Sequence, residues 1–146
     1  MLGDKVAGDK VLGDKVVLDF VKIRARLELL ELPTFDWVIG VATGGTVPAS
    51  LLAYKLGCPL GLIHLNYRAE DNTPRYAAPR LQAPFGRLEA RAVLLVDDVS
   101  VTGATLSAAK AQLGACAVTT LVMKGHADIV LFPEIASCVR WPWKLS

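Results

Sequence analysis

The chain has 146 residues, of which 53% are hydrophobic and 21% are charged, and its formal net charge is +2. This length and composition indicate a single folded domain with a large core, and they favour a packed globule over a disordered chain. The small charge and the strand-sized apolar runs give no reason to expect nucleic acid or a membrane as a partner. The three cysteines are widely spaced, which argues against a disulfide framework or a zinc site, so a cytoplasmic protein is expected.

The N-terminus repeats a Gly-Asp-Lys-Val unit, which begins at Gly3, Gly8 and Gly13. A period of five residues matches neither a helix nor a strand, and three copies are too few for a solenoid. Residues 1–15 are therefore expected to form either a flexible leader or an ordered arm that makes oligomer contacts. A homo-oligomer is expected, with a dimer favoured.

A helical pattern follows the repeats, because apolar side chains recur at three- and four-residue steps from Val17 to Leu30. Asp14 is a plausible N-cap for this helix, since its side chain can accept a hydrogen bond from a first-turn amide. Pro33 is a plausible stop, because proline cannot continue a helix.

Three more elements precede a long irregular stretch. The apolar run at 37–42 predicts a buried strand. Residues 47–56 predict a helix closed by Gly57, and 60–65 predict a second strand. Residues 66–90 contain three prolines and mixed charge, which predicts a long connection of the kind that often forms a lid.

Regular patterns return after this connection. They predict a strand at 92–96, a helix at about 104–113 that ends at Gly114, and a strand at 117–123. Strands that alternate with helices predict an α/β fold, with a mainly parallel sheet that carries helices on both faces.

Two adjacent acids, Asp97 and Asp98, follow the strand at 92–96. Ligands of parallel sheets bind beyond the carboxyl ends of the strands, and the next loop leads into a helix N-terminus, which favours an anion. The residues of this loop are Val99, Ser100, Val101, Thr102, Gly103, Ala104 and Thr105. Its hydroxyl groups add donors and its glycine lets the backbone come close, so a phosphate fits the loop while the acids accept hydrogen bonds from sugar hydroxyls.

The stretch VLLVDDVSVTGATL at 93–106 resembles the phosphoribosyl pyrophosphate (PRPP) signature of the type I phosphoribosyltransferases. The resemblance implies that the loop holds the 5-phosphate of PRPP and that Asp97 and Asp98 hold its ribose. It also implies Mg²⁺, which the two acids would reach indirectly through ribose hydroxyls or water. The family pattern divides the chain into a leader at 1–15, a core at 16–124 and a small C-terminal hood at 125–146.

A second motif, GVATGGTVPA at 40–49, resembles the pyrophosphate loop of the same family. Its backbone N–H groups would bind the diphosphate, and they belong to Ala42, Thr43, Gly44 and Gly45. The connection at 66–90 lies where the family has its flexible lid. Three of its arginines are candidates to reach the diphosphate, although each is equally well explained as a solvated surface residue: Arg68, Arg75 and Arg80.

The tail resembles the bacterial xanthine-guanine branch of the family, in which a lysine after the fifth strand contacts the exocyclic oxygen of a 6-oxopurine. Lys124 matches that lysine, and it is as readily read as a surface residue at a strand end. Trp141 is a candidate to stack on the base, whereas Trp143 is expected in the core.

Two departures from the pattern leave the base open. Val101 stands where 6-oxopurine enzymes typically have a third aspartate, and Lys144 stands where a hood acid often follows the Pro-Trp pair. Adenine and orotate members of the family also lack an acid at the first of these places. The expected function is transfer of the 5-phosphoribosyl group of PRPP to a base, a purine favoured, with release of pyrophosphate. The alternative is a regulatory module that binds PRPP or a nucleotide without turnover.

Overall fold

A computed structural model describes residues 10–12, 15–65, 80–82, 88 and 92–144. It divides the chain into two compact units, one built from the segments up to Leu32 and from Glu134 onward, and the other running from Pro33 to Pro133. The helix at 20–29 and the C-terminal residues therefore belong to one unit, and the division into leader, core and hood stays a prediction. None of the helices among the described residues is both long enough and apolar enough to cross a membrane.

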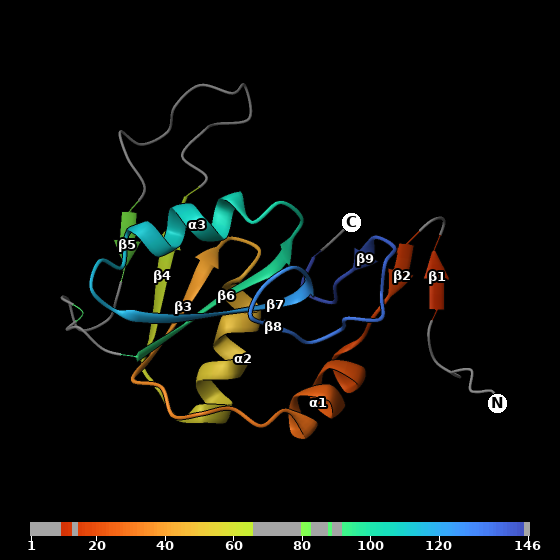
Figure 1. The fold of residues 1–146 in the computed structure, drawn as a ribbon. Coiled ribbons are helices and arrows are strands. Elements are labelled where there is room, and N and C mark those ends of the chain that lie inside the picture. Colours follow the sequence, from red (N-terminus) through yellow and green to blue (C-terminus); the bar gives the residue numbers. More distant parts are fainter. Residues whose placement is uncertain (1–9, 13–14, 66–79, 83–87, 89–91, 145–146) are drawn as a thin grey trace. The chain divides into compact units, whose positions relative to one another are not determined.

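The larger unit contains a six-stranded sheet with the strand order β5-β4-β3-β6-β7-β8 (Figure 1). All neighbouring strands in it are parallel except β4 and β5, which pair in the antiparallel direction. The strands are β3 (Trp37–Ala42), β4 (Leu60–His64), β5 (Arg80–Gln82), β6 (Ala92–Ser100), β7 (Ala117–Gly125) and β8 (Ile129–Val130). The helices of this unit are α2 (Thr46–Leu56) and α3 (Ala104–Ala111), and Gly57 closes α2 in the left-handed conformation.

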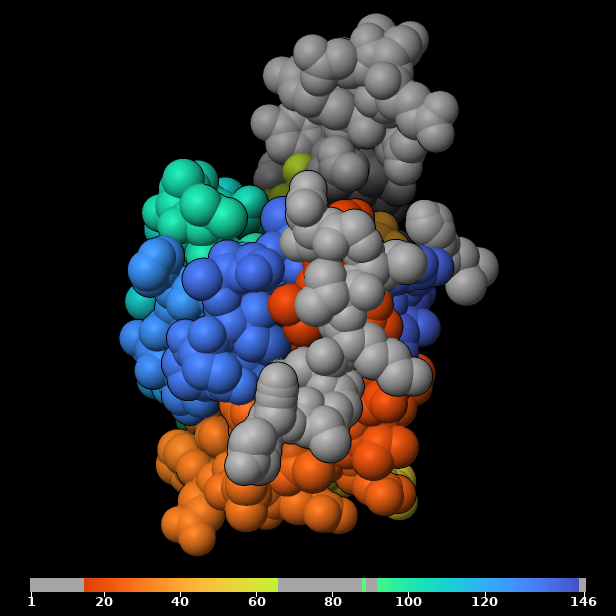
Figure 2. Space-filling view, turned by 90° about the vertical axis from the view of Figure 1, so that its right-hand side faces the viewer, coloured from red at the N-terminus to blue at the C-terminus, as the bar shows by residue number. Residues whose placement is uncertain are grey.

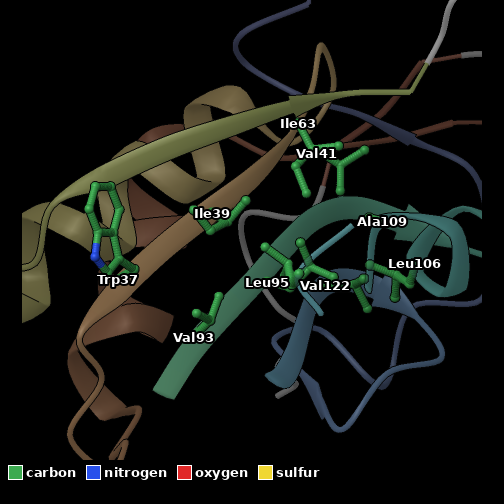
Figure 3. Packing of buried hydrophobic residues seen from close by; sticks show 10 residues of the cluster. Trp37, Ile39, Val41, Ile63, Val93, Leu95, Leu106, Ala109 and Val122 are labelled. Atoms are coloured by element: carbon green, nitrogen blue, oxygen red, sulfur yellow. The ribbon is translucent and has the colours of Figure 1, made fainter. Parts of the chain in front are cut away.

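Helix α3 packs on one face of the sheet, where alternate residues of the central strands form an apolar core (Figure 3). The cluster consists of Trp37, Ile39, Val41, Ile63, Val93, Leu95, Leu106, Ala109, Leu113 and Val122. The strand residues share this face because successive side chains of a strand point to opposite sides. The N-terminal end of α3 (green) lies at the surface in the space-filling view (Figure 2), and Ala104 and Thr105 are exposed there.

Helix α2 packs on the opposite face, where Val38 and Leu94 are fully buried. The helix lies so close to β3 that a Cβ atom added to Gly40 would be 2.6 Å from the Cβ of Ala49. Residue 40 must therefore lack a side chain for α2 to keep this position. The two helices on opposite faces confirm the predicted α/β fold with a mainly parallel sheet.

The two central strands are longer than the sequence predicts. Strand β6 continues past the acids to Ser100, and β7 continues to Gly125, because Val99 pairs with Lys124 and Ser100 with Gly125. The predicted loop from position 99 to position 105 is therefore wrong in extent. Only positions 101–103 lie between the strand and α3.

The smaller unit has a three-stranded sheet with the order β1-β2-β9 and one helix, α1 (Phe20–Leu29). Strands β1 (Lys10–Leu12) and β2 (Lys15–Val17) pair in the antiparallel direction, and β2 pairs in parallel with β9 (Val139–Arg140). Part of the repeat segment is thus ordered in strands. Whether it serves in oligomer contacts stays a prediction.

Helix α1 begins later than predicted. Asp19, and not Asp14, is its N-cap, with the side-chain oxygen accepting a hydrogen bond from the amide of Lys22 at 2.9 Å. The reason is that β2 pairs with the C-terminal strand β9, which keeps residues up to Val17 extended. The helix ends at Leu29, before Pro33 is reached, because Leu30 is already extended.

Candidate functional site

Asp97 and Asp98 lie near the carboxyl end of β6 and are only 6% and 8% exposed. Each carboxylate accepts a hydrogen bond from the next backbone amide: Asp97 Oδ1 from the N–H of Asp98 at 2.8 Å, and Asp98 Oδ1 from the N–H of Val99 at 2.8 Å. These local bonds limit the rotamers of both side chains. Because neighbours in a strand point to opposite faces, Asp98 lies on the α2 side of the sheet and Asp97 on the α3 side.

The turn between β3 and α2 packs directly against these acids. A Cβ atom added to Gly44 would lie 2.6 Å from Oδ2 of Asp98, and one added to Gly45 would lie 2.9 Å from Cα of Asp97. The turn also contains a cis peptide bond between Ala42 and Thr43. Since β3 and β6 are adjacent and parallel, their carboxyl ends bring the glycine turn and the acid pair together.

The backbone of this turn is partly used for its own hydrogen bonds. The N–H of Gly45 donates to the carbonyl of Val41 at 2.7 Å, and the N–H of Thr46 donates to that of Thr43 at 3.0 Å. The amide predicted at Gly45 is therefore not directed to a ligand in this conformation. Ala42 is buried at the end of β3, whereas Thr43 is exposed and Gly44 half-buried, which makes the last two the stronger candidates for a diphosphate contact.

The segment between β6 and α3 is open to solvent. Val101 is 74% exposed, Thr102 is also exposed, and Gly103 has a φ of 84°, a left-handed conformation that favours glycine. The hydroxyl of Thr102 accepts a hydrogen bond from the amide of Ala104 at 3.3 Å. The first turn of α3, which includes the exposed Thr105, has no acidic residue, so its N-terminus suits an anion.

Val99 and Ser100 belong to the strand and do not form part of this exposed segment. The amide of Val99 is used by Asp98, as described above, and the carbonyl of Ser100 accepts a hydrogen bond from the amide of His126 at 2.8 Å. Ser100 is 5% exposed, and its Oγ has no hydrogen-bond partner among the described residues. Ser100 was predicted to supply a hydroxyl from the loop, but it supplies a buried hydroxyl from strand β6.

Lys124 reaches the same end of the sheet on β7, where it is half-buried and pairs in register with Val99. The next residue, Gly125, has a φ of 114°, and a side chain there would overlap the carbonyl of Ser100. This close approach was missed by sequence reasoning. The signal that indicates it is a glycine directly after an apolar strand, a frequent mark of close backbone contact.

Trp141, the predicted base-stacking residue, belongs to the smaller unit, where its ring stacks on Trp143 with a centroid distance of 5.3 Å and an interplanar angle of 6°. One face of Trp141 is thus already covered by a protein ring. Trp141 is the buried member of this pair and Trp143 is half-buried, so the core role expected for Trp143 fits Trp141 better.

The lid predictions fall largely outside the described residues. Arg68 and Arg75 lie in the segment that is not described, and Arg80 is described only as a backbone position of β5, paired with His64. Among the described residues, no group of three or more His, Cys, Asp or Glu side chains comes together as a metal site.

Comparisons with known proteins agree with this geometry. A family model for the phosphoribosyl transferase domain matches residues 29–126. An orotate phosphoribosyltransferase of Sulfurisphaera tokodaii is 37% identical over 75 residues, which is 51% of this chain and 34% of that protein. The bifunctional protein PyrR of Ralstonia nicotianae is 31% identical over 120 residues, 75% of this chain and 68% of that protein.

Not all similar proteins are named as enzymes. The transcriptional regulator GfcR 1 of Methanosarcina barkeri is 34% identical over 110 residues, which covers 72% of this chain and 53% of the regulator. The chain spans between about a third and a half of the length of the first curated relatives that it matches.

Among solved structures, a purine phosphoribosyltransferase from Pyrococcus horikoshii superposes with a TM-score of 0.71 at 28% identity, over 91% of this chain and 96% of that one. A protein from Neisseria gonorrhoeae with bound ppGpp superposes with a TM-score of 0.61 at 19% identity, over 93% and 92% of the two chains. At that identity the second likeness concerns the fold alone.

Proposed function

The chain belongs to the type I phosphoribosyltransferase family, and we propose that it binds PRPP and transfers its 5-phosphoribosyl group to a nitrogenous base with release of pyrophosphate. The observation that carries this proposal is the convergence of three parts at one end of the sheet. These parts are the turn at Thr43 and Gly44, the acid pair on β6 and the exposed start of α3. Together they offer amides for a diphosphate, carboxylates for a ribose and a helix N-terminus for a phosphate.

Each part has a task in the reaction. Cleavage of the bond between ribose C1 and pyrophosphate develops positive charge on the sugar and negative charge on the leaving group. Asp97 and Asp98 orient the ribose through its hydroxyls and favour the adjacent cation, while the amides of Thr43 and Gly44 stabilise charge on the leaving oxygen. The start of α3 holds the 5-phosphate and so fixes the sugar for attack by a base nitrogen from the opposite face.

Mg²⁺ is the expected metal for this reaction, and the donor set of the site is compatible with it. Mg²⁺ in phosphate sites is held by substrate phosphates, water and one or two carboxylates, without a cage of protein ligands. Asp97 and Asp98 lie on opposite faces of β6, so each carboxylate would reach the ion only indirectly, through ribose hydroxyls or water. When bound, the ion would neutralise the diphosphate.

We favour a purine as the acceptor base. The support is the half-buried Lys124 at the same end of the sheet, which is suited to donate to an exocyclic oxygen, and the likeness to a protein named as a purine phosphoribosyltransferase. Val101 places an apolar side chain where an acid is typical of 6-oxopurine enzymes, so a base that needs no proton transfer at that position fits as well.

A second candidate function is a regulatory module that binds PRPP or a nucleotide without turnover. Two observations favour it: the exposed Val101 in place of an acid, and the similarity to proteins named as transcriptional regulators. On this reading the same amides and carboxylates bind the ligand, and no base is consumed.

One experiment separates the two functions. The full chain is incubated with PRPP, Mg²⁺ and, in turn, adenine, guanine, hypoxanthine, xanthine, orotate and uracil, and pyrophosphate release is measured beside PRPP binding by calorimetry. Release with one base supports the transferase. Saturable binding without release from any base supports the regulatory module, and absence of both would overturn the PRPP assignment itself.

A further inference from the structure

Helix α1 has apolar side chains on two opposite sides. Ile23 and Leu27 are buried on one side of the helix. Val21, Ala25 and Leu29 are spaced by four residues on the other side, where all three are exposed, Val21 by 63% and Leu29 by 79%. With about 100° per residue, these three fall on one line along the helix, opposite to the buried pair. We call this line the outer stripe of α1.

The exposed apolar side chains of α1 are clustered and not scattered singly over the surface. Three of the large hydrophobic side chains that are exposed in the described part of the chain belong to this ten-residue helix: Phe20, Val21 and Leu29. Phe20 already has a neighbour, because its ring lies 6.1 Å from that of Trp143. Apolar residues that line up on one exposed helix face are typical of a protein contact surface.

Charges beside the stripe indicate which partner fits it. Arg24 and Glu28 lie one turn apart along the same flank of Val21, Ala25 and Leu29. A second copy of α1, placed antiparallel by a twofold axis near Ala25, sets Val21 against Leu29 of the other copy. Arg24 of each copy then lies on the same flank as Glu28 of the other, offset along the axis by two residues' rise, about 3 Å. The small side chain of Ala25 lets the two helix axes come close at the axis of symmetry.

We infer that the outer stripe of α1 is the surface through which two copies of this chain associate, as an antiparallel helix pair with two symmetric Arg24–Glu28 contacts. This inference does not depend on the proposed function. A helix of ten residues is about 15 Å long, so the pair buries less than the roughly 1,200 Å² of a stable interface. The association is therefore weak and depends on protein concentration.

A charge-exchange series tests the geometry. Sedimentation equilibrium of the full chain, from about 1 to 300 μM, gives the dimer dissociation constant of each variant. Arg24→Glu and Glu28→Arg each place like charges beside each other in the pair, and each raises that constant about tenfold or more. The double variant R24E/E28R restores opposite charges and returns the constant to within about threefold of the starting value.

Lys110→Glu on the exposed side of α3 makes the same change in net charge as Arg24→Glu and serves as the matched control. It leaves the dimer constant unchanged, and far-ultraviolet circular dichroism checks that all four variants keep the native helix content. A monomer at the highest concentration overturns the inference. So does a double variant that fails to recover association, or a control that weakens it as much as the single changes on α1.

Discussion

The carboxylate of Asp98 fills the space that a side chain at Gly44 would need. A methyl group on Gly44 would lie 2.6 Å from Oδ2 and 2.7 Å from Oδ1 of Asp98. Real Cβ atoms do not approach other atoms so closely, so the carboxylate keeps its position only because residue 44 has no side chain. The glycine of one motif and the acid of the other are thus a single structural unit. In this chain the Gly-Gly turn and the acid pair are therefore coupled.

The first prediction concerns this contact. Gly44→Ala forces the Asp98 carboxylate out of its place and weakens PRPP binding about tenfold or more, or about 1.4 kcal/mol, measured by calorimetry with Mg²⁺. Gly57→Ala is the control, because Gly57 has a φ of 71° with nothing within 4 Å of an added Cβ. It lowers stability by about 1 kcal/mol through backbone strain and leaves PRPP affinity unchanged. Equal affinities for wild type and Gly44→Ala would contradict the coupling.

The second prediction concerns the buried hydroxyl of Ser100, which has no hydrogen-bond partner among the described residues. A buried polar group without a partner costs about 1–3 kcal/mol, so Ser100→Ala is neutral or raises the free energy of unfolding in urea. If this hydroxyl donates to the ligand, the same variant binds PRPP about fivefold more weakly. Ser107→Ala, on the exposed side of α3, changes neither quantity. Loss of stability in Ser100→Ala would mean that the hydroxyl has a protein partner.

The sequence predicted the elements whose limits depend on local residues. Strand β3 was predicted at its observed bounds, Trp37–Ala42, because every residue of it is buried and the apolar run has no break. Helix α2 was predicted within one residue, because Gly57 gives the left-handed residue that ends it. These signals lie within a few residues of the element that they define.

Elements whose limits depend on distant partners were predicted less well. Residues 15–17 fit a helical pattern as well as a strand, and only their pairing with β9, more than 120 positions later, makes them β2. The same pairing moves the N-cap from Asp14 to Asp19, although both are aspartates. In the site, the sequence motif identified the two acids and the loop after them. They did not reveal that Ser100 is buried or that the Gly45 amide bonds within its own turn, because both follow from strand pairing and turn geometry.

The third prediction separates the base from PRPP. Lys124→Ala lowers kcat/KM for the base about tenfold or more and changes PRPP affinity less than threefold, because Lys124 lies on β7 beside Val99 and not at the phosphate turn. Asp98→Ala, by contrast, weakens PRPP binding itself while the fold is kept. Lys55→Ala, an exposed lysine in the last turn of α2, alters neither constant. Equal losses for base and PRPP in Lys124→Ala would assign this lysine a structural role.

The last prediction concerns the ion pair of the smaller unit. Arg26 donates from Nη1 to Oε1 of Glu134 at 3.2 Å and from Nη2 to Oε2 at 2.7 Å, which links α1 to the start of the C-terminal segment. The hydrogen bond from Arg26 lowers the pKa of Glu134 below its ordinary value of 4.5, with burial acting in the opposite direction. Both side chains are partly exposed, so solvent screening limits the contribution of the pair to about 0.5 kcal/mol.

The pH dependence follows from the direction of this shift. A carboxyl group whose pKa is lowered by folding stabilises the protein fully at pH values above its pKa in the unfolded state. This contribution disappears as the pH falls through its pKa in the folded state. Glu134→Gln therefore lowers the melting temperature at pH 7 by about 1–2 °C, and the difference from wild type fades below about pH 4.5. Calorimetric melting between pH 3 and pH 7 measures this, with Glu31→Gln, an exposed acid of the same unit, as the control for charge alone. A difference that stayed constant down to pH 3 would show that the substitution acts through packing and not through the lost ion pair.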